Sequence, residues 1–442
     1  MVGFAFSTAG CSPISRNRPN RMNAPVPVRG RQLGTTRRMA FHGLAARVCE
    51  PFLSRFDQGL EAGTIEAVLP DGSCRILGGR GTGPVARIDF LRWRALLRVA
   101  LGGSVGFYNA WADGDWRSAD LVSVFDLTTR NRITLGATAR ASGLAALLRR
   151  VNHWRRRNSR AGAKRNILAH YDLGNDFYQT WLDETMSYSG AVFGEPVSAD
   201  ESLEAAQRRK VAALLDRLEL RPESDILEIG CGWGYLANHC ASLGHHVTAI
   251  TLSPSQKLWA ERAAKGLATP PDYQLRDYRD MSGSHDAIIS VEMVEAVGQA
   301  YWPAYLDTIA RCLKPGGRAA IQFISIADDI FPAYEKGADF IQTYVFPGGM
   351  LLSESRFRAL AEARGLRWEY PFHLPLHYAE TLLRWRNRFD RAVDEGRLPP
   401  GFDQRFANLW RYYLQYCEGG FRGGGVNVAQ VTLVKPDVGD VG

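Results

Sequence analysis

The sequence predicts an α/β protein whose larger domain is built on a doubly wound, largely parallel sheet. Between residues 202 and 326, short apolar stretches typical of buried strands alternate with segments of helical periodicity. The first of these strands, "DILEIG" (225–230), leads into three glycines at alternate positions, Gly230, Gly232 and Gly234. Alternating strands and helices, with a glycine-rich turn after the first strand, are typical of parallel sheets covered by helices on both faces.

Length and composition allow one large domain and a smaller one. The chain has 442 residues, of which 45% are hydrophobic and 23% charged, so it can bury a substantial core. No apolar run approaches the roughly 18–20 residues that span a bilayer. The seven cysteines include no CxxC pair, which predicts neither a metal site nor a disulfide framework and fits a reducing cytoplasm.

The first part of the chain predicts a basic leader and a small α/β domain. Residues 1–57 have no acidic residue before Glu50, which predicts a disordered leader that ends in a short helix. Residues 58–148 are assigned to the small domain. Within them "GTIEAVLPDGSCRILGG" predicts a hairpin that turns at "PDG", and "RIDFLRWRALLRVA" has helical periodicity. The segment "GSVGFYNAWADGDW" (103–116) fits either a packed loop and helix or a surface that contacts lipid.

The run "RRVNHWRRRNSRAGAKR" (149–165) contains no acidic residue and predicts a basic linker. Such a run fits a solvated segment or a contact with an anionic lipid surface. No nucleic-acid recognition motif accompanies it, so nucleic acid is not an expected partner.

Residues 166–435 are predicted to form the large domain. Helices are expected at "SLEAAQRRKVAALLDRL" (202–218), "YLANHCASL" and "PSQKLWAERAAKG". Strands are expected at "DILEIG", "HVTAITL", "HDAIISVEMV" and "RAAIQFISI". The last strand is entered through "LKPGG", which predicts a helix end followed by a turn.

The glycine turn is expected to bind a ligand, because open α/β sheets bind ligands at the carboxyl ends of their strands. A dinucleotide fingerprint has its third glycine one residue later and an acidic residue about twenty positions on, to hold a ribose. Here the corresponding stretch, "AITLSPSQ", offers Thr251, Ser253 and Gln256 instead. NAD is therefore disfavoured.

Six segments together resemble the cyclopropane-fatty-acyl-phospholipid synthase family, whose members are class I S-adenosylmethionine (SAM) methyltransferases. In order they are "HYDLGNDFYQTWLDETMSYSGAVF", "ILEIGCGWG", "ITLSPSQ", "MVEAVG", "YVFPGG" and "YYLQYCEGGFR". The resemblance runs from about residue 100 to 433, and more weakly back to about 58. It implies a Rossmann-like methyltransferase domain preceded by a smaller, lipid-associated α/β domain.

The resemblance implies SAM as cofactor. The free N–H groups at the start of the helix after Gly234 suit the methionine carboxylate, and Gln256 can hold ribose hydroxyls. Asp277 can accept from the adenine amino group. The alternative role of Thr251 and Asp277 is to cap helices. The residues implied to hold the cofactor are Tyr188, Ser189, Glu228, Gly230, Gly232, Gly234, Thr251, Leu252, Gln256, Asp277 and Tyr278.

The chemistry that the resemblance implies is alkylation of the cis double bond of an acyl chain, which leaves a carbocation in an apolar site. In the family a bound bicarbonate removes the proton. Its cage would be formed here by Glu295, Tyr378 and the backbone of Ile324. Two positions depart from the pattern: Gly190 replaces a cysteine and Gln322 replaces a histidine.

The change at Gln322 places bicarbonate in doubt, because an amide donates a hydrogen bond but carries no proton or positive charge. The hypothesis that follows is methyl transfer without ring closure. Cys417 matches a cysteine that the family has often been assigned as active. Alkene methylation needs no thiolate, so Cys417 is interpreted as lining the acyl pocket or packing in the core.

The expected function is therefore SAM-dependent transfer of a methylene or methyl group to unsaturated acyl chains of phospholipids, giving cyclopropane or methyl-branched chains. Two alternatives stay open: methylation of a small lipophilic natural product, and a non-enzymatic lipid-binding relative. The expected partner is the phospholipid bilayer surface, with a homodimer left open. The expected location is cytoplasmic, at the inner face of the membrane.

Overall fold

The computed structural model describes residues 35–136 and 173–437, with side chains described from Ala45 on. The predicted leader up to residue 34 and the predicted basic linker at 149–165 lie outside the described residues. The chain divides into two compact units, Met1–Leu44 and Ala45–Gly442, and every contact described here lies within the second.

A small four-stranded sheet follows the first helix, α1 (Thr35–Gln58). Its strands are β1 (Ala62–Val68), β2 (Cys74–Gly78), β3 (Gly81–Phe90) and β4 (Trp116–Arg117), in the order β2-β1-β3-β4. β1 and β2 are antiparallel, and Gly72 N–H donates to Leu69 O across the turn (2.9 Å), which confirms the predicted hairpin. α1 is longer than the short helix expected. Its residues Cys49 and Leu53 are buried in the same core as the sheet, so α1 contributes to the packed domain.

Three helices accompany this sheet: α2 (Arg94–Ala112), α3 (Leu121–Arg130) and α4 (Arg132–Leu135). The helix predicted from residue 87 begins only at Arg94, because Arg87–Phe90 pair with β1 and β4 as the end of β3. The segment 103–116 continues α2 and ends in the buried Trp116, as expected of a packed helix. α2 is broken at Gly103, whose φ of 55° and ψ of −141° are not helical.

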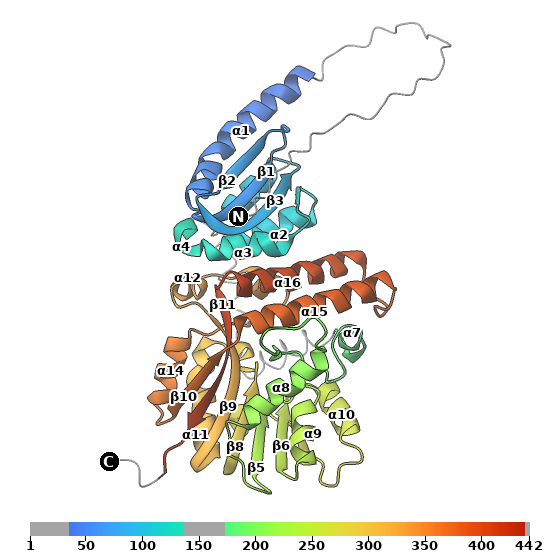
Figure 1. Cartoon of the computed structure of the whole chain (residues 1–442), viewed down its shortest axis with the longest axis vertical. Coiled ribbons are helices and arrows are strands. Elements are labelled where there is room, and N and C mark those ends of the chain that lie inside the picture. Colours follow the sequence, from blue (N-terminus) through green and yellow to red (C-terminus); the bar gives the residue numbers. More distant parts are fainter. Residues whose placement is uncertain (1–34, 137–172, 438–442) are drawn as a thin grey trace, which may run out of the picture. The chain divides into compact units, whose positions relative to one another are not determined.

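The large sheet has seven strands in the order β10-β11-β9-β8-β5-β6-β7 (Figure 1). Five of them are parallel, which confirms the predicted class: β5 (Asp225–Ile229), β6 (His246–Thr251), β7 (Asp272–Leu275), β8 (His285–Val291) and β9 (Leu313–Ile326). The last strand, β11 (Val426–Val434), is antiparallel to both β9 and β10 (Arg367–His373). The turn predicted at "LKPGG" is instead the start of β9, because Gly316 and Gly317 pair with Lys435.

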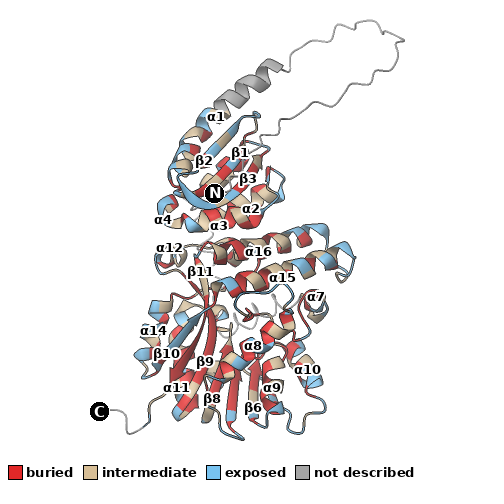
Figure 2. Ribbon diagram, viewed as in Figure 1, coloured by how far each residue is buried: buried red, intermediate tan, exposed pale blue. Residues whose placement is uncertain are grey.

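Helices cover both faces of this sheet, and successive strand residues belong to separate cores. Leu227 and Ile288 pack with α11 (Trp302–Cys312) and α14 (Glu354–Glu362). Ile226 and Ile289 pack with α8 (Leu203–Leu215), α9 (Tyr235–Ser242) and α10 (Pro254–Ala263). The central strands are therefore buried on both sides, as Figure 2 shows.

Two long antiparallel helices, α15 (Pro375–Asp394) and α16 (Gln404–Arg422), complete the second unit. A Cβ at Gly419 of α16 would lie 2.4 Å from Phe125 of α3, so glycine permits the two helices to approach closely. The short segments between the strands are α7 (Asn175–Gln179), η2 (Tyr278–Asp280), η3 (Val294–Ala296), η4 (Gln299–Tyr301), α12 (Phe331–Tyr334) and α13 (Phe340–Tyr344). Within the described residues, no helix is both long and apolar enough to cross a bilayer.

Candidate active site

The turn after β5 presents bare backbone to a cavity. Gly230, Gly232 and Gly234 have φ values of 86°, 52° and 85°. A Cβ at Gly230 would lie 2.6 Å from Met293, and one at Gly234 would lie 2.5 Å from Ala260, so packing requires glycine at both positions. A Cβ at Gly232 would meet no atom within 4 Å. Gly232 is therefore the point at which a ligand can approach the backbone.

This cavity, about 180 Å³ in volume, lies where the sheet order changes direction beside β5. Gly234 and Asp277 do not contribute to its wall. The other nine residues predicted to hold the cofactor line it: Tyr188, Ser189, Glu228, Gly230, Gly232, Thr251, Leu252, Gln256 and Tyr278.

Asp277 is engaged by its own neighbours in the structure, and its expected contact with adenine stays a prediction. Asp277 caps η2 by accepting from the N–H of Arg279 (3.0 Å), and the Nε of Arg279 also lies 2.8 Å from its carboxylate. Asp277 thus has the capping role that was the alternative, in addition to any contact with the cofactor. Thr251 is different: its hydroxyl donates to Gln256 Oε1 (3.0 Å) and accepts from the N–H of Ser253 (3.1 Å).

Two buried polar atoms in this cavity await a partner. Gln256 Nε2 donates no hydrogen bond, and Glu228 Oε2 forms none, within the described part of the chain. Burial raises the pKa of Glu228 to about 8. Together with the start of α9, where Tyr235 and Leu236 line the cavity, these atoms suit the hydroxyl, amino and carboxylate groups of SAM. The residues present therefore fit this cofactor.

A buried lysine connects the cofactor cavity with the carboxylates around it. Lys210 of α8 donates to Ser189 Oγ (2.8 Å) and is 3% exposed. Burial lowers its pKa to about 8, and the charges of Glu292, Asp183 and Glu228 oppose that change. Lys210 therefore supplies positive charge between Glu228 and Glu292.

The carboxylate of Glu292 lies at the junction between the cofactor cavity and a second, apolar cavity, because Glu292 lines both. Its Oε1 accepts from the N–H of Gly190 (2.8 Å) and from Gln322 Nε2 (2.8 Å). Its Oε2 accepts from the hydroxyl of Tyr378 (2.9 Å). Three donors thus converge on one anion that belongs to the chain itself.

The backbone of Glu292 adopts a φ of 48°, a left-handed conformation that favours glycine and is uncommon for a glutamate. Backbone strain of this kind tends to occur at functional sites. Burial raises the pKa of Glu292, whereas the hydrogen bonds from Gln322, Gly190 and Tyr378 and the charge of Lys210 lower it. The pKa is therefore raised overall, and the hydrogen bonds and Lys210 limit the rise that burial alone would cause.

Gln322 and Gly190 lie behind Glu292 and line neither cavity. Gln322, 1% exposed, also donates to the carbonyl of Gly190 (3.0 Å) and accepts from Gln430 (3.0 Å). A Cβ at Gly190 would lie 2.5 Å from the ring of Tyr378, so a cysteine would not fit here without a shift of that ring. These two residues contact Glu292 directly, and their predicted place in an anion cage stays a prediction.

Glu295, predicted as the cage glutamate, also lines the apolar cavity. Its Oε1 accepts from the N–H of Ile324, and its Oε2 is buried without a hydrogen-bond partner among the described residues. Burial, together with the neighbouring charge of Glu292, raises its pKa to about 8. Glu295 is therefore largely protonated at neutral pH, and the coupling between the two neighbouring carboxyl groups favours a single negative charge there.

The apolar cavity has a volume of about 800 Å³. It begins at Tyr378, Ile324 and Cys417, passes α16, and extends into the small domain between α2, α3 and its sheet, where Phe107 and Val124 line it. Burial raises the pKa of the Cys417 thiol far above its usual range, so Cys417 lines the wall as a thiol.

Glu292 and Lys210 are the site residues that the sequence analysis missed. In "SVEMVEAVG" two glutamates follow the strand, and only the second was singled out. A signal was present, since Glu292 is the first residue after β8 and so lies at the carboxyl end of a central strand. Lys210 occurs on the predicted amphipathic helix at a position that faces the sheet.

The fold, the glycine turn and the polar groups around it define a class I SAM-dependent methyltransferase. The family model described as mycolic acid cyclopropane synthetase matches residues 158–431, and the chain belongs to this family. The cofactor is SAM, and the protein is a methyltransferase that acts on lipid chains.

Known relatives include enzymes with different products. The chain is 39% identical to tuberculostearic acid methyltransferase UfaA1 of Mycobacterium tuberculosis over 76% of this chain and 80% of that protein. It is 31% identical to cyclopropane-fatty-acyl-phospholipid synthase of Escherichia coli over 76% and 85%. Among solved structures, mycolic acid cyclopropane synthase CmaA1 in complex with SAH and CTAB is 28% identical, with a TM-score of 0.57, covering 62% of this chain and 98% of that chain.

Proposed function

We propose that the protein methylates the cis double bond of an unsaturated acyl chain of a phospholipid and releases a methyl-branched or methylene-branched chain rather than a cyclopropane. The observation that carries the proposal is the carboxylate of Glu292 at the junction of the two cavities. When bound, SAM supplies an electrophilic methyl group and leaves as S-adenosylhomocysteine after the alkene carbon has formed the new C–C bond.

The apolar cavity supports an acyl chain as substrate. Its wall near Glu292 is formed by Ile324, Phe346, Leu382 and Phe421, which exclude water from the carbocation left on the chain. The carboxylate of Glu292 stabilises this cation electrostatically. The attraction between the two charges is stronger in an apolar site than in water. Burial of an acyl chain there is favourable by about 0.8 kcal/mol for each CH₂ group.

Glu292 is proposed to take the place of a bound bicarbonate. Its carboxylate already accepts the hydrogen bonds of Gly190, Gln322 and Tyr378, positions that the family resemblance assigned to the cage of that anion. As the base, Glu292 accepts one proton, and the electrons of the broken C–H bond neutralise the cation. The proton leaves to solvent after the product has dissociated.

The hydrogen bonding of Glu292 supports branching over ring closure. Burial raises the pKa of Glu292, but the three donors make it less basic than an equally buried carboxylate without hydrogen bonds, so removal of a proton from the new methyl group is slowed. A hydride can then shift from the methyl-bearing carbon to the neighbouring cationic carbon, which moves the charge to a more stable tertiary centre. Loss of a proton next to this centre gives a branched, unsaturated chain. The similarity to a tuberculostearic acid methyltransferase also supports this outcome.

The test is a reaction with SAM carrying a CD₃ group and vesicles of dioleoylphosphatidylglycerol. We expect a product that shows a methyl or exocyclic methylene signal in its proton NMR spectrum. Retention of three deuterium atoms indicates that the proton left the chain, and retention of two indicates that it left the methyl group. Upfield cyclopropane signals in the main product would contradict the proposed branching.

The same assay separates the phospholipid substrate from a soluble one. We expect SAM consumption only when unsaturated phospholipid vesicles are present, which would support action at a membrane surface, as proposed for the inner face of the cytoplasmic membrane. Consumption with a soluble lipophilic acceptor, and none with vesicles, would favour methylation of a small natural product.

A further inference from the structure

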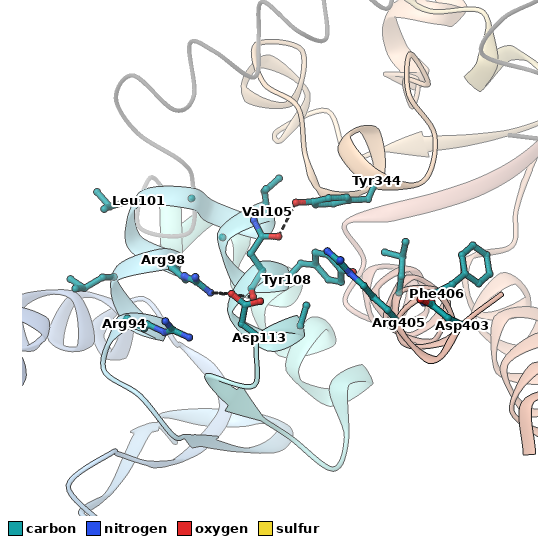
Figure 3. Close-up of a pocket in the computed structure, with 16 residues that line it drawn as sticks. Arg94, Arg98, Leu101, Val105, Tyr108, Asp113, Tyr344, Asp403, Arg405 and Phe406 are labelled. Carbon is teal, nitrogen blue, oxygen red and sulfur yellow. Dashed lines mark hydrogen bonds and ion pairs between the residues drawn. The ribbon is translucent and has the colours of Figure 1, made fainter. Parts of the chain in front are cut away.

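A second cleft, separate from the cofactor cavity, lies between α2, α13 and the start of α16 (Figure 3). It has a volume of about 730 Å³. One wall is α2 from Arg94 to Asp113, and the other is formed by Tyr344 and by residues 403–409. Tyr344 donates a hydrogen bond to Asn109 (2.8 Å), which joins the two walls.

The cleft carries an excess of positive charge. The buried carboxylate of Asp115 accepts from three arginines, at 2.9 Å from Arg92, 2.8 Å from Arg94 and 3.0 Å from Arg98. Asp113 is the second acid, 2.6 Å from Arg98. Of these residues, Arg94, Arg98 and Asp113 line the cleft, together with Asp403 and Arg405 of the opposite wall, so three guanidinium groups and two carboxylates form its lining. Each guanidinium has five N–H donors, so donors remain for a further anion.

Arg405 adds a positive charge from the opposite wall. It is exposed and forms no ion pair with any of the residues that the structure describes. Figure 3 shows it extending toward Tyr108, across the cleft from Arg98. Guanidinium groups bind phosphate oxygens in a bidentate manner, and an unpaired one at a concave site suits a phosphate.

The remainder of the cleft is apolar. Leu97 and Leu101 are 41% and 62% exposed, and they follow Arg94 and Arg98 on the same helix at a spacing of three residues. Val105, Phe406 and Leu409 continue this surface. A site that combines arginines with exposed leucines is complementary to an amphipathic anion, whereas a soluble phosphate compound would leave the leucines in water.

The cleft adjoins the apolar cavity of the active site at the break in α2. Gly102 lines both, and Gly103, with its non-helical φ and ψ, lines the inner cavity. A Cβ at Gly102 would meet no atom within 4 Å. Gly102 therefore has open space beside it and contributes no side chain to the boundary between the two spaces.

We propose that this cleft binds the phosphate-bearing head group of a phospholipid whose acyl chain passes the α2 break at Gly102–Gly103 into the cavity that ends at Glu292. The proposal rests on the proposed function for the identity of the chain, and it assigns a new site to the head group. Arg405, with the free donors of Arg94 and Arg98, holds the phosphate, and Leu97 and Leu101 contact the first carbons of the chain.

The first test compares Arg405→Gln with Arg391→Gln in the full-length protein. Arg391 is also exposed, lies on α15 outside the cleft, and forms no ion pair with a described residue. We expect Arg405→Gln to weaken co-sedimentation with dioleoylphosphatidylglycerol vesicles, and to raise the apparent KM for them, about fivefold, with kcat unchanged. Arg391→Gln should match the wild type. Equal effects of the two substitutions would overturn the proposal.

The second test places bulk at the α2 break with Gly102→Trp. We expect vesicle binding and SAM binding to persist while turnover of vesicle lipid falls at least about tenfold, because the chain no longer passes. Leu243→Trp, at an exposed position after α9, is the control for added bulk. Full turnover by Gly102→Trp would overturn the route.

Two further outcomes separate the possible sources of error. If inorganic phosphate at millimolar concentration binds in an Arg405-dependent manner while vesicle binding is independent of Arg405, the cleft serves a soluble anion and the proposal is wrong. If vesicle binding depends on Arg405 but unsaturated lipid stimulates no SAM consumption, the head-group site stands and the proposed function is wrong.

Discussion

The amide nitrogen of Gln322 lies 2.8 Å from a carboxylate oxygen of Glu292, and both side chains are held by β-strands of the large sheet or by the turn that follows one. This contact gives a structural role to the glutamine that stands where the family has a histidine. The neutral amide of Gln322 donates a hydrogen bond to the carboxyl group of Glu292, which belongs to the chain itself. No protonated histidine is needed to hold this group in place. The reaction site is therefore complete in its negative charge before any small anion binds.

Glu292→Gln should abolish most of the turnover while SAM binding is retained. A glutamine has the same shape but accepts no proton, and loss of a general base commonly reduces a rate by about 10²–10⁴-fold. The measurement is S-adenosylhomocysteine formation with lipid vesicles, alongside calorimetric titration with SAM. A variant with more than half of the wild-type rate would show that Glu292 is not the base.

Glu292→Gly offers a sharper version of this test. The φ of 48° is easily adopted by glycine, so the variant should fold, and the deleted side chain leaves space between Tyr378 and Gln322. We expect added bicarbonate or acetate to restore part of the turnover of this variant and to leave the wild type unaffected. Absence of rescue by either anion would argue against a direct proton transfer to this carboxylate.

The two substitutions Glu295→Gln and Glu295→Ala should differ. Because the pKa of Glu295 is raised to about 8, the side chain is mostly neutral at pH 7, and glutamine should keep the rate within about threefold. Alanine removes the acceptor of the Ile324 N–H and leaves a cavity, so turnover should fall at least about tenfold with SAM affinity retained. Near-full activity of Glu295→Ala would remove Glu295 from the site.

Tyr378→Phe should move the acidic limb of the pH–rate profile to higher pH. Glu292 must be ionised to accept a proton, so the rate falls as the pH drops through its raised pKa. Loss of the hydrogen bond from Tyr378 removes one interaction that lowers this pKa, and the limb shifts upward. Tyr412→Phe is the control, since the buried hydroxyl of Tyr412 has no partner among the described residues. An unshifted limb in Tyr378→Phe would contradict the assignment.

Gln322→His tests which residue decides the fate of the cation. An imidazole can carry the proton away from Glu292, which should speed removal of a proton from the new methyl group. We expect the ratio of cyclopropane to branched product, measured by proton NMR, to rise relative to the wild type. An unchanged ratio at undiminished turnover would show that this position has no influence on ring closure.

Gly232→Val should lose both SAM binding and turnover. The φ of 52° strains a β-branched residue, and its side chain would project into the open space of the cofactor cavity. Thermal unfolding of the variant separates lost binding from lost folding. SAM affinity equal to that of the wild type would show that the cofactor does not approach this turn.

The class of fold was predictable from local signals. The alternation of β5, β6, β8 and β9 with α9 and α10 follows from periodicity, because strands buried on both faces read as apolar runs. The antiparallel position of β11 was not predictable, because it depends on pairing with a strand about a hundred residues away. The same holds for the start of α2, which the pairing of Arg87–Phe90 with β1 and β4 moved to Arg94.

The sequence by itself determined which functional groups are available: a glycine turn for SAM, two glutamates after a strand, and a tyrosine in the C-terminal part of the chain. Only the tertiary structure decided which glutamate receives the three hydrogen bonds, that Asp277 caps a helix, and that the small domain encloses part of the acyl cavity. The physical reason is that hydrogen bonds and cavity walls join residues from 52 to 430 along the chain, and such contacts leave no periodic trace in the sequence.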